Sequence, residues 1–209
     1  MQDLESFGYP QNSVAVKLKN GCGGVGFKIL NDEKAKKISC LTSRTARVNP
    51  YITLEQFKDM ATNGRYLMQT YLPGTELGVL SLVDNGRTIY SLCHDNYDMQ
   101  YATTVDCELV KNEEAESIVR QVNELLHLDG NIGYDFKRDE NGKLWLLEIN
   151  PRISATVSLA VKAGLNIVEM GILHKLGLPI DENVEPLYGL RMMRVYGTLY
   201  SYKGEPYGK

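Results

Sequence analysis

The sequence predicts a mixed fold of the α/β or α+β class. Short apolar runs that are typical of strands alternate along the chain with amphipathic stretches that are typical of helices. Two Asn-Gly pairs, Asn85-Gly86 and Asn141-Gly142, separate apolar runs and favour tight hairpin turns. Gly164 and Gly177 follow helical patterns and suit the left-handed position that ends a helix.

Composition places the chain among ordinary globular proteins. Its 209 residues are enough for one or two domains with a sizeable core, and 43% of them are hydrophobic. The 23 Lys and Arg residues against 26 Asp and Glu residues leave a formal net charge of −3. A nucleic-acid-binding surface normally shows a basic excess, so we expect no nucleic-acid partner.

Cysteine usage and hydropathy predict a soluble protein of the cytoplasm. Cys22, Cys40, Cys93 and Cys107 are scattered and have no metal-ligand spacing, which is typical of reduced thiols. No run approaches the about 18 apolar residues of a membrane span. The first residues, 1–9, lack the basic-then-apolar pattern of a signal peptide. We therefore expect no membrane partner.

The first half of the chain contains mostly predicted strands. A short helix is expected from Thr53, which forms a capping-box pattern with Gln56, to about Asn63. The predicted strands of this half are residues 14–18, 27–30, 66–69, 77–83 and 88–94.

The second half alternates helices with one hairpin and a final strand. The helix after Asn112 has an apolar face made of Ala115, Ile118, Val119, Val122, Leu125 and Leu126. The remaining predicted elements are strands 132–137 and 143–149, helices 155–163 and 167–176, and a strand at 190–199.

The second hairpin places two acidic residues opposite each other. If Asn141-Gly142 forms a two-residue type I′ turn, paired positions sum to 283 and Asp135 faces Glu148. Because side chains alternate, the core face would carry Tyr134, Phe136, Trp145, Leu147 and Ile149. The opposite face would carry Asp135, Lys137, Leu146, Glu148 and Asn150.

Facing carboxylates are destabilising unless a positive charge compensates them. A Mg²⁺ ion would do so, since it takes one or two carboxylates and draws its other ligands from waters and substrate phosphates. Alternatively, Lys137 or a nearby arginine neutralises the pair on an ordinary solvated face. The hairpin alone leaves both interpretations open.

A glycine-rich connection, residues 21–26, follows Lys17 at the end of a strand. Its four glycines would let backbone N–H groups approach a phosphate, and Lys17 would supply charge. It is not a P-loop, and it leads into a strand and not into a helix, which disfavours a dinucleotide-binding fold. A tight or mobile hairpin is the alternative interpretation.

Three separated segments carry a more specific pattern, and they are Val14–Lys17 with its glycine-rich connection, Met68–Glu76 and Leu146–Arg152. In this order they resemble the ATP-grasp superfamily, in particular the ATP-binding domain of the carbamoyl phosphate synthetase large subunit. The resemblance extends over about residues 8 to 178. It implies two α+β lobes with antiparallel sheets that clasp ATP between them. The small lid lobe would span about residues 1–68 and the larger lobe residues 69–209.

The resemblance assigns nucleotide contacts to both lobes. Lys17 would contact the phosphates and take part in catalysis, and the lid would be formed by Gly23, Gly24 and Gly26. In the second segment, Gln69 would meet the adenine amine, the backbones of Thr70 and Leu72 the purine edge, and Glu76 the ribose hydroxyls. Many members carry Glu where this chain has Gln69, which offers an acceptor without charge.

The third segment would hold the metal. Asp135, Glu148 and Asn150 would bind one or two Mg²⁺ ions, or Mn²⁺, that bridge the phosphates of ATP. This is the constellation that the hairpin register indicates independently. Arg152 would act as a catalytic residue close to the γ-phosphate and the acyl-phosphate.

The implied activity is that of an ATP-dependent carboxylate–amine or carboxylate–thiol ligase. The alternatives are a non-catalytic ATP-binding module or subunit of a split enzyme, and an ATP-grasp kinase. Members usually begin with a separate α/β domain, whereas this chain starts almost at the Lys17 strand. The chain is therefore interpreted as a fragment, as one half of a split protein, or as a reduced relative whose missing parts come from elsewhere. ATP and a small carboxylate are the expected ligands, and in a split protein a second chain would supply the N-terminal domain.

Two further features each have two interpretations. His94 could face the reaction site, although a surface histidine is the favoured interpretation. In the tail, Arg191, Arg194 and Tyr196 could contact anions, but completion of a sheet is the favoured interpretation.

Overall fold

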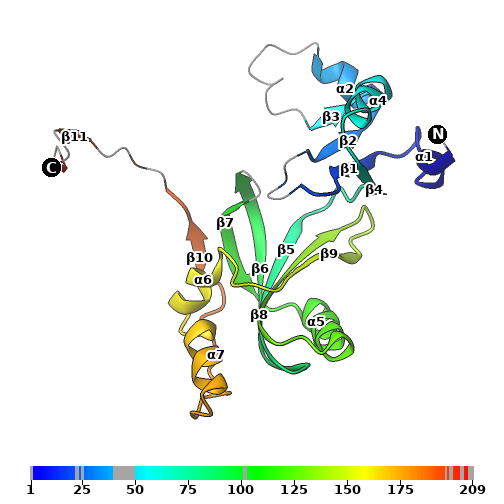
Figure 1. The fold of residues 1–209 in the computed structure, drawn as a ribbon. Helices are drawn as coiled ribbons and strands as arrows, with labels where there is room; N and C mark the ends of the chain where they lie inside the picture. Colours follow the sequence, from blue (N-terminus) through cyan, green and yellow to red (C-terminus); the bar gives the residue numbers. More distant parts are fainter. Residues whose placement is uncertain are drawn as a thin grey trace. The chain divides into compact units, whose positions relative to one another are not determined.

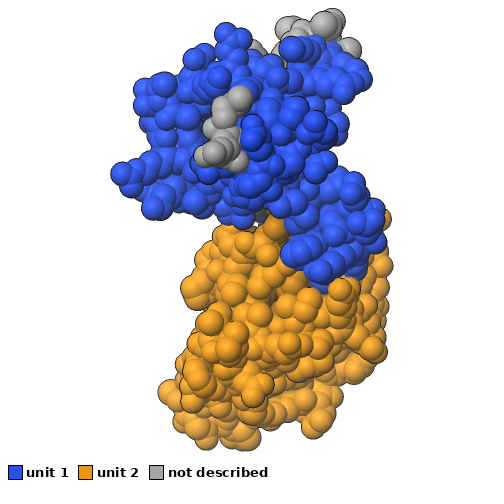
Figure 2. Space-filling model, turned by 90° about the vertical axis from the view of Figure 1, so that its right-hand side faces the viewer, with its two compact units in different colours: residues 1–75, 101–103, 137–145 blue, residues 76–100, 104–136, 146–209 orange. Residues whose placement is uncertain are grey.

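The computed structural model describes residues 2–21, 24, 26–39, 50–100, 103–195, 197, 200–202 and 205–206. The chain divides into two compact units, coloured in Figure 2. Unit 1 comprises residues 1–75, 101–103 and 137–145, and unit 2 comprises residues 76–100, 104–136 and 146–209. The lobe boundary expected near residue 68 stays a prediction. Cys22, Gly23, Cys40 and Tyr196 lie outside the described residues.

Unit 1 contains a four-stranded sheet in the order β3-β2-β1-β4. Its strands are β1 (Val14–Leu18), β2 (Lys28–Leu30), β3 (Tyr51–Ile52) and β4 (Tyr66–Thr70). Strand β1 is antiparallel to β2 and β4, and β2 is parallel to β3. The helices of this unit are α1 (Gln2–Ser6), α2 (Asp32–Ser39) and α4 (Leu54–Ala61). The predicted strands on both sides of the glycine-rich connection are confirmed.

The core of unit 1 lies on one face of β1. Val14 and Val16 are fully buried against apolar side chains that include Leu4 and Phe57. Thr53 caps α4 as predicted: its hydroxyl accepts from the Gln56 N–H, and the Gln56 side chain accepts from the Thr53 N–H. Alternation along β1 therefore sends Lys17 to the face opposite this core.

The second sheet has six strands in the order β10-β7-β6-β5-β8-β9 (Figure 1). They are β5 (Glu76–Asp84), β6 (Arg87–Gln100), β7 (Thr103–Val110), β8 (Gly130–Arg138), β9 (Leu144–Asn150) and β10 (Arg191–Met193). The helices are α5 (Glu113–Leu126), α6 (Val157–Lys162) and α7 (Ile167–Lys175), and a small ribbon pairs β11 (Ser201–Tyr202) with β12 (Glu205–Pro206). No helix within the described ranges is long and apolar enough to cross a membrane.

The helices pack on both faces of the six-stranded sheet. Leu80 and Leu82 of β5 belong to a core cluster with α6 and the start of α7. Ser81 points to the other face, where the buried Asn123 of α5 reaches its hydroxyl. Because neighbouring residues of a strand face opposite sides, β5 is covered on both sides and is almost entirely buried.

Helix α5 forms where the sequence predicts it. Asn112 caps its first turn by accepting from the Ala115 N–H. The predicted apolar face is wrong at its end, because Leu125 and Leu126 are 77% and 51% exposed. The buried stripe instead contains Asn123, which donates to Thr88 and accepts from the Tyr134 hydroxyl.

The two Asn-Gly pairs form different turns. Asn85 and Gly86 have φ values of 44° and 92°, and Asp84 pairs with Arg87, as a two-residue type I′ turn requires. At the second pair only Gly142 has a positive φ, 81°, and the Asp139 N–H donates to the Lys143 carbonyl at 3.0 Å. The second loop therefore has three residues, and the predicted two-residue turn is wrong.

The carboxylate of Asp139 explains the longer loop. It accepts from the backbone N–H groups of Asn141 and Lys143 and from Nε1 of Trp145. These bonds stabilise a conformation in which Asn141 need not adopt a positive φ. The predicted core face is wrong on β9, where Trp145 and Leu147 are 45% and 41% exposed. Its other part is confirmed, since Tyr134 and Phe136 of β8 are fully buried.

Two strand predictions need correction. Among the described residues of the expected strand at 190–199, only 191–193 form a strand, β10, after which Arg194 donates to the carbonyls of Thr104 and Ala155. Strand β7 is absent from the sequence-based expectations, although Val105, Cys107 and Leu109 alternate with polar residues along it. Cys93 and Cys107 are both buried free thiols.

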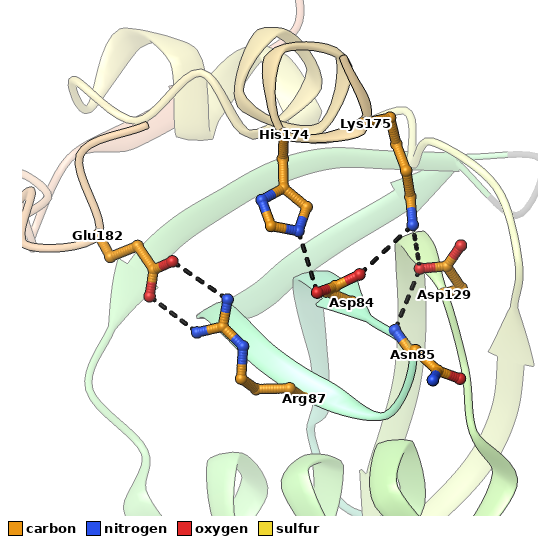
Figure 3. Close-up of polar contacts among 7 residues, drawn as sticks. All are labelled: Asp84, Asn85, Arg87, Asp129, His174, Lys175 and Glu182. Carbon is orange, nitrogen blue, oxygen red and sulfur yellow. Dashed lines mark hydrogen bonds and ion pairs between the residues drawn. The ribbon is translucent and has the colours of Figure 1, made fainter. Parts of the chain in front are cut away.

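The β5–β6 turn carries a group of ion pairs that connects it to α7 (Figure 3). The Asp84 carboxylate lies 3.0 Å from His174 Nε2 and 3.5 Å from Lys175 Nζ. Lys175 also lies 2.7 Å from Asp129, and Arg87 forms two bonds with Glu182. Every charge drawn in Figure 3 at this end of β5 has an opposite charge beside it.

Candidate nucleotide and metal site

The structure brings the three predicted metal-binding residues together in unit 2. Asp135 lies on β8, and Glu148 and Asn150 lie on β9. The Asn150 amide donates to the Asp135 carboxylate at 3.0 Å. Gly133 lies across from Asn150, since a β-carbon added there would lie 3.7 Å from that of Asn150. The two strands thus return to the predicted facing, although the turn that joins them differs.

Electrostatics at Asp135 show that negative charge is crowded at this site. The pKa of Asp135 is raised above its usual value. The main cause is desolvation of the carboxylate by the surrounding protein, and the charges of Glu148 and Glu76 come next. Arg152 and the Asn150 hydrogen bond act in the opposite direction. Their effect is smaller, so the pKa of Asp135 stays raised. Asp135 nevertheless remains accessible to solvent and to ligands.

Arg152 is exposed and is placed by the backbone that follows β9. Its N–H donates to the Asn150 carbonyl at 2.7 Å, which closes a tight turn centred on Pro151. Its guanidinium donates to the Ile153 carbonyl at 3.3 Å, and its positive charge acts to lower the pKa of Asp135. A cation that lies beside a metal site is suited to bind phosphate oxygens.

The donor set fits a Mg²⁺ ion. Asp135 and Glu148 supply carboxylates and Asn150 supplies an amide oxygen, which are the hard oxygen ligands that this metal prefers. In the described parts of the chain, no three His, Cys, Asp or Glu side chains gather closely enough to hold a metal on their own. Water and phosphate oxygens would therefore complete the coordination.

The remaining predicted nucleotide contacts divide between the units. In unit 1, Ala15 pairs with Gln69 and Lys17 with Leu67, so Lys17 and Gln69 share the face of β1 and β4 that lies opposite the core. Thr70 is exposed and Leu72 is buried. Gly24 and Gly26 have φ values of 72° and 76°. Their roles in nucleotide binding stay predictions.

Glu76 lies with the acidic group in unit 2. It is the first residue of β5, pairs with Asn96 of β6, and raises the pKa of Asp135. The sequence suggested only a ribose contact for Glu76. Its place beside the metal-binding residues follows from the pairing of β5 with β8, which local sequence does not reveal.

His94 is buried and not on the surface, so the favoured prediction is wrong. Its side chain is 3% exposed, and its ring nitrogens contact Asn96 at 2.9 Å and Thr156 at 3.1 Å. Burial lowers the pKa of His94 to about 4. Sequence reasoning did not single out Asn96 or Thr156.

A cavity of about 400 Å³ lies elsewhere in unit 2, between α7 and the start of β8. Apolar side chains such as Ile153, Val168 and Leu176 form most of its lining. It includes none of the residues predicted to bind nucleotide or metal. The candidate site is therefore the open acidic group around Asp135 and not this cavity.

Solved structures with known ligands share this fold. N5-carboxyaminoimidazole synthetase from Staphylococcus aureus, complexed with ADP, matches 93% of this chain and 50% of its own at 17% identity and a TM-score of 0.66. Biotin carboxylase from Campylobacter jejuni, in a complex with β-γ-ATP, matches 85% of this chain and 39% of its own at 18% identity and a TM-score of 0.57.

The biotin carboxylase domain of the Hydrogenobacter thermophilus 2-oxoglutarate carboxylase, in complex with MgADP, ADP and bicarbonate, is similar in the same way. It matches 86% of this chain and 39% of its own at 19% identity and a TM-score of 0.57. The chain thus spans half or less of the length of these proteins. At such identities the likeness establishes the fold, which is that of the ATP-grasp class.

The sequence comparison is more specific. Residues 62–198 match the family described as ATP-grasp in the biosynthetic pathway with Ter operon. Because this match extends over more than half of the chain, the protein belongs to that ATP-grasp family. No curated protein matches its sequence.

Proposed function

We propose that this chain binds Mg-ATP and uses it to activate a small carboxylate, as part of an ATP-dependent carboxylate–amine or carboxylate–thiol ligase. The observation that carries the proposal is the raised pKa of Asp135, caused in part by the charge of Glu148, with Asn150 bonded to Asp135 and Arg152 acting on it. An acidic group of this kind is stabilised by a divalent cation, and a triphosphate supplies that cation with further oxygen ligands.

In the proposed reaction, a carboxylate oxygen of the substrate attacks the γ-phosphorus of ATP. The bond to the β–γ bridging oxygen breaks, and an acyl-phosphate and ADP form. An amine, ammonia or a thiol then attacks the acyl carbon and releases phosphate. The protein would act mainly by positioning and by stabilising charge, as in other phosphoryl transfers.

Each residue has a defined part in this proposal. Asp135, Glu148 and Asn150 would hold Mg²⁺, or Mn²⁺, which when bound offsets the charge of the phosphates. Arg152 would bind the oxygens of the γ-phosphate and later those of the acyl-phosphate. Lys17 would bind the phosphates as a point charge, and Gln69 would accept from the adenine amine.

Thermal unfolding with ADP and ATP, each with and without Mg²⁺, tests nucleotide binding. A ligand at about 100 times its Kd adds about 2.7 kcal/mol, which raises the melting temperature by several degrees. We expect this rise only when Mg²⁺ is present. A melting temperature that no nucleotide changes, with or without Mg²⁺, would refute the proposal for this chain.

Substitution of Lys17 separates phosphate from adenosine recognition. Lys17→Ala should weaken the binding of ATP more than that of adenosine, whereas equal losses would contradict the phosphate role of Lys17. If ATP binds, phosphate release with panels of carboxylates and amines tests the chemistry. A stable phosphorylated product formed without an amine would indicate a kinase. Binding without turnover would indicate a non-catalytic module.

A further inference from the structure

A chain of polar side-chain contacts, buried at the bond between His94 and Thr156, leads from β6 to the segment that carries Arg152. Segment 150–156 lies between β9 and α6, outside either element except for its first residue. In it the Ser154 and Thr156 hydroxyls lie 3.0 Å apart, and Thr156 lies 3.1 Å from His94 Nε2. The other ring nitrogen of His94 lies 2.9 Å from the side-chain oxygen of Asn96.

The donors and acceptors in this chain can be ordered. The Asn96 oxygen is only an acceptor, so Nδ1 of His94 carries the ring proton and Nε2 accepts from the Thr156 hydroxyl. The Thr156 oxygen then accepts from Ser154. A neutral ring is required for this order, and burial lowers the pKa of His94 to about 4, which keeps it neutral at pH 7.

Two neighbours show that the structure is built around this contact. Thr156 is the N-cap residue of α6, but its hydroxyl makes no capping bond to the helix and is directed to His94 instead. Gly78 lies opposite His94 on β5, and a β-carbon at Gly78 would overlap the imidazole ring. The side-chain-free position on β5 thus leaves space for a histidine that is 3% exposed.

We propose that His94 is a positioning residue for the phosphate-binding arginine: by accepting from Thr156 it orders segment 150–156 and so holds Arg152 beside the carboxylates. This inference rests on the proposed function, since it assigns a purpose to the position of Arg152. Arg194 holds the same segment from another side through the Ala155 carbonyl, at 2.6 Å. The ring nitrogens of His94 contact Asn96 and Thr156, so His94 acts on Arg152 through the segment and not directly.

The test compares four variants of the full chain. Thr156→Val and His94→Leu remove the bond, whereas His94→Gln keeps an acceptor close to the Nε2 position. Ser81→Ala is the matched control, because Ser81 is a buried hydroxyl of the same sheet that donates to the Tyr90 carbonyl and lies outside the His94 contacts. Amide hydrogen exchange across residues 150–157, measured by mass spectrometry, reports the order of the segment in the free protein.

We expect Thr156→Val and His94→Leu to accelerate exchange in this segment about tenfold, and His94→Gln and Ser81→Ala to leave it close to the wild-type rate. By calorimetry, the first two variants should also bind Mg-ATP about tenfold more weakly while their affinity for adenosine is unchanged. A general loss of structure would instead weaken both ligands together.

Three results would overturn the inference: unchanged exchange in Thr156→Val and His94→Leu, equal acceleration in Ser81→Ala, or equal losses of Mg-ATP and adenosine affinity. If the wild-type chain binds no Mg-ATP, the proposed function fails. The exchange rates then still decide by themselves whether His94 orders the segment.

Discussion

Acidic residues near the two ends of strand β5 have pKa values that are shifted in opposite directions. At the β5–β6 turn, Asp84 lies beside His174 and Lys175, and Asp129 lies beside Lys175. The hydrogen bond from His174 is the main cause of the lowered pKa of Asp84, and the bond from Lys175 is the main cause of the lowered pKa of Asp129. At this end, Lys175 and His174 of α7 provide the partners of the two carboxylates.

At the beginning of β5 the balance is reversed. Glu76 lies with Asp135 and Glu148, and the pKa of Asp135 is raised although Arg152 and Asn150 act against the shift. The charges at the turn end thus join secondary-structure elements, whereas at the other end the neighbouring carboxylates raise the pKa of Asp135. A carboxylate whose pKa is raised by its neighbours marks the candidate site.

The largest expected effect is on nucleotide affinity, which should fall for a substitution at the beginning of β5 and not for one at its turn end. Glu148→Gln should weaken the binding of Mg-ATP by about 100-fold, because it removes a charged ligand of the metal. Asp129→Asn, which removes a carboxylate at the paired end, should leave the Kd for Mg-ATP unchanged. Calorimetric titrations of both variants measure the difference. An unchanged Kd in Glu148→Gln would remove Glu148 from the metal site.

The next largest effect concerns the β5–β6 turn, at the end of β5 where the acidic residues form ion pairs. Asn85→Ala should lower the free energy of unfolding by about 1 kcal/mol, because alanine tolerates a left-handed conformation less well than asparagine does. Asn141→Ala, in the three-residue loop, should change it by less than about 0.5 kcal/mol. Urea unfolding compares the two. Equal losses would show that positive φ does not govern the stability of the first turn.

The pH dependence of stability should have opposite signs at the two ends. Without divalent metal, ionised Asp135 is unfavourable in the folded state, so Asp135→Asn should be more stable than the wild type at pH 7. This gain should vanish as the pH falls through the raised pKa of Asp135. Asp84→Asn should be less stable at pH 7, and its deficit should vanish as the pH falls through the lowered pKa of Asp84.

Urea unfolding of both variants and the wild type between pH 3 and pH 7, in the presence of a chelator, measures these differences. Parallel pH profiles of the two variants would contradict the contrast between the ends. Addition of Mg²⁺ should erase the advantage of Asp135→Asn at pH 7, because the metal compensates the charge of the wild-type carboxylate.

The smallest expected effect is the loss of a surface cation. Lys175→Met removes the partner shared by Asp84 and Asp129, and it should lower the melting temperature by a few degrees at most, since exposed ion pairs contribute little. Lys162→Met, at an exposed position of α6, is the control. The difference between them should shrink in high salt. A difference that persists there would show that Lys175 acts through packing.

Sequence patterns predicted those elements whose signals are local. The capping residues of α4 and α5, the first Asn-Gly turn and the glycines that end α6 and α7 all formed as expected, because each depends on a few adjacent residues. The second Asn-Gly pair failed for the same reason. The side chain of Asp139 competes for the backbone of that loop, and the dipeptide signal does not include it.

The candidate site was predictable to the extent that two strands of one hairpin define it. The alternation of β8 and β9 is enough to bring Asp135, Glu148 and Asn150 to one place. Glu76 joins them only because β5 pairs with β8, and the burial of His94 depends on Gly78 of the neighbouring strand. Such contacts join residues that are distant in the chain.

The sequence by itself determined the fold class, the family and the residue types of the candidate site, because these follow from hydrophobic periodicity, turn residues and three short motifs. Only the tertiary structure decided which charges are compensated and which polar side chains are buried. The physical reason is that pKa values and burial depend on all the groups that surround a side chain, whereas sequence patterns report only its neighbours along the chain.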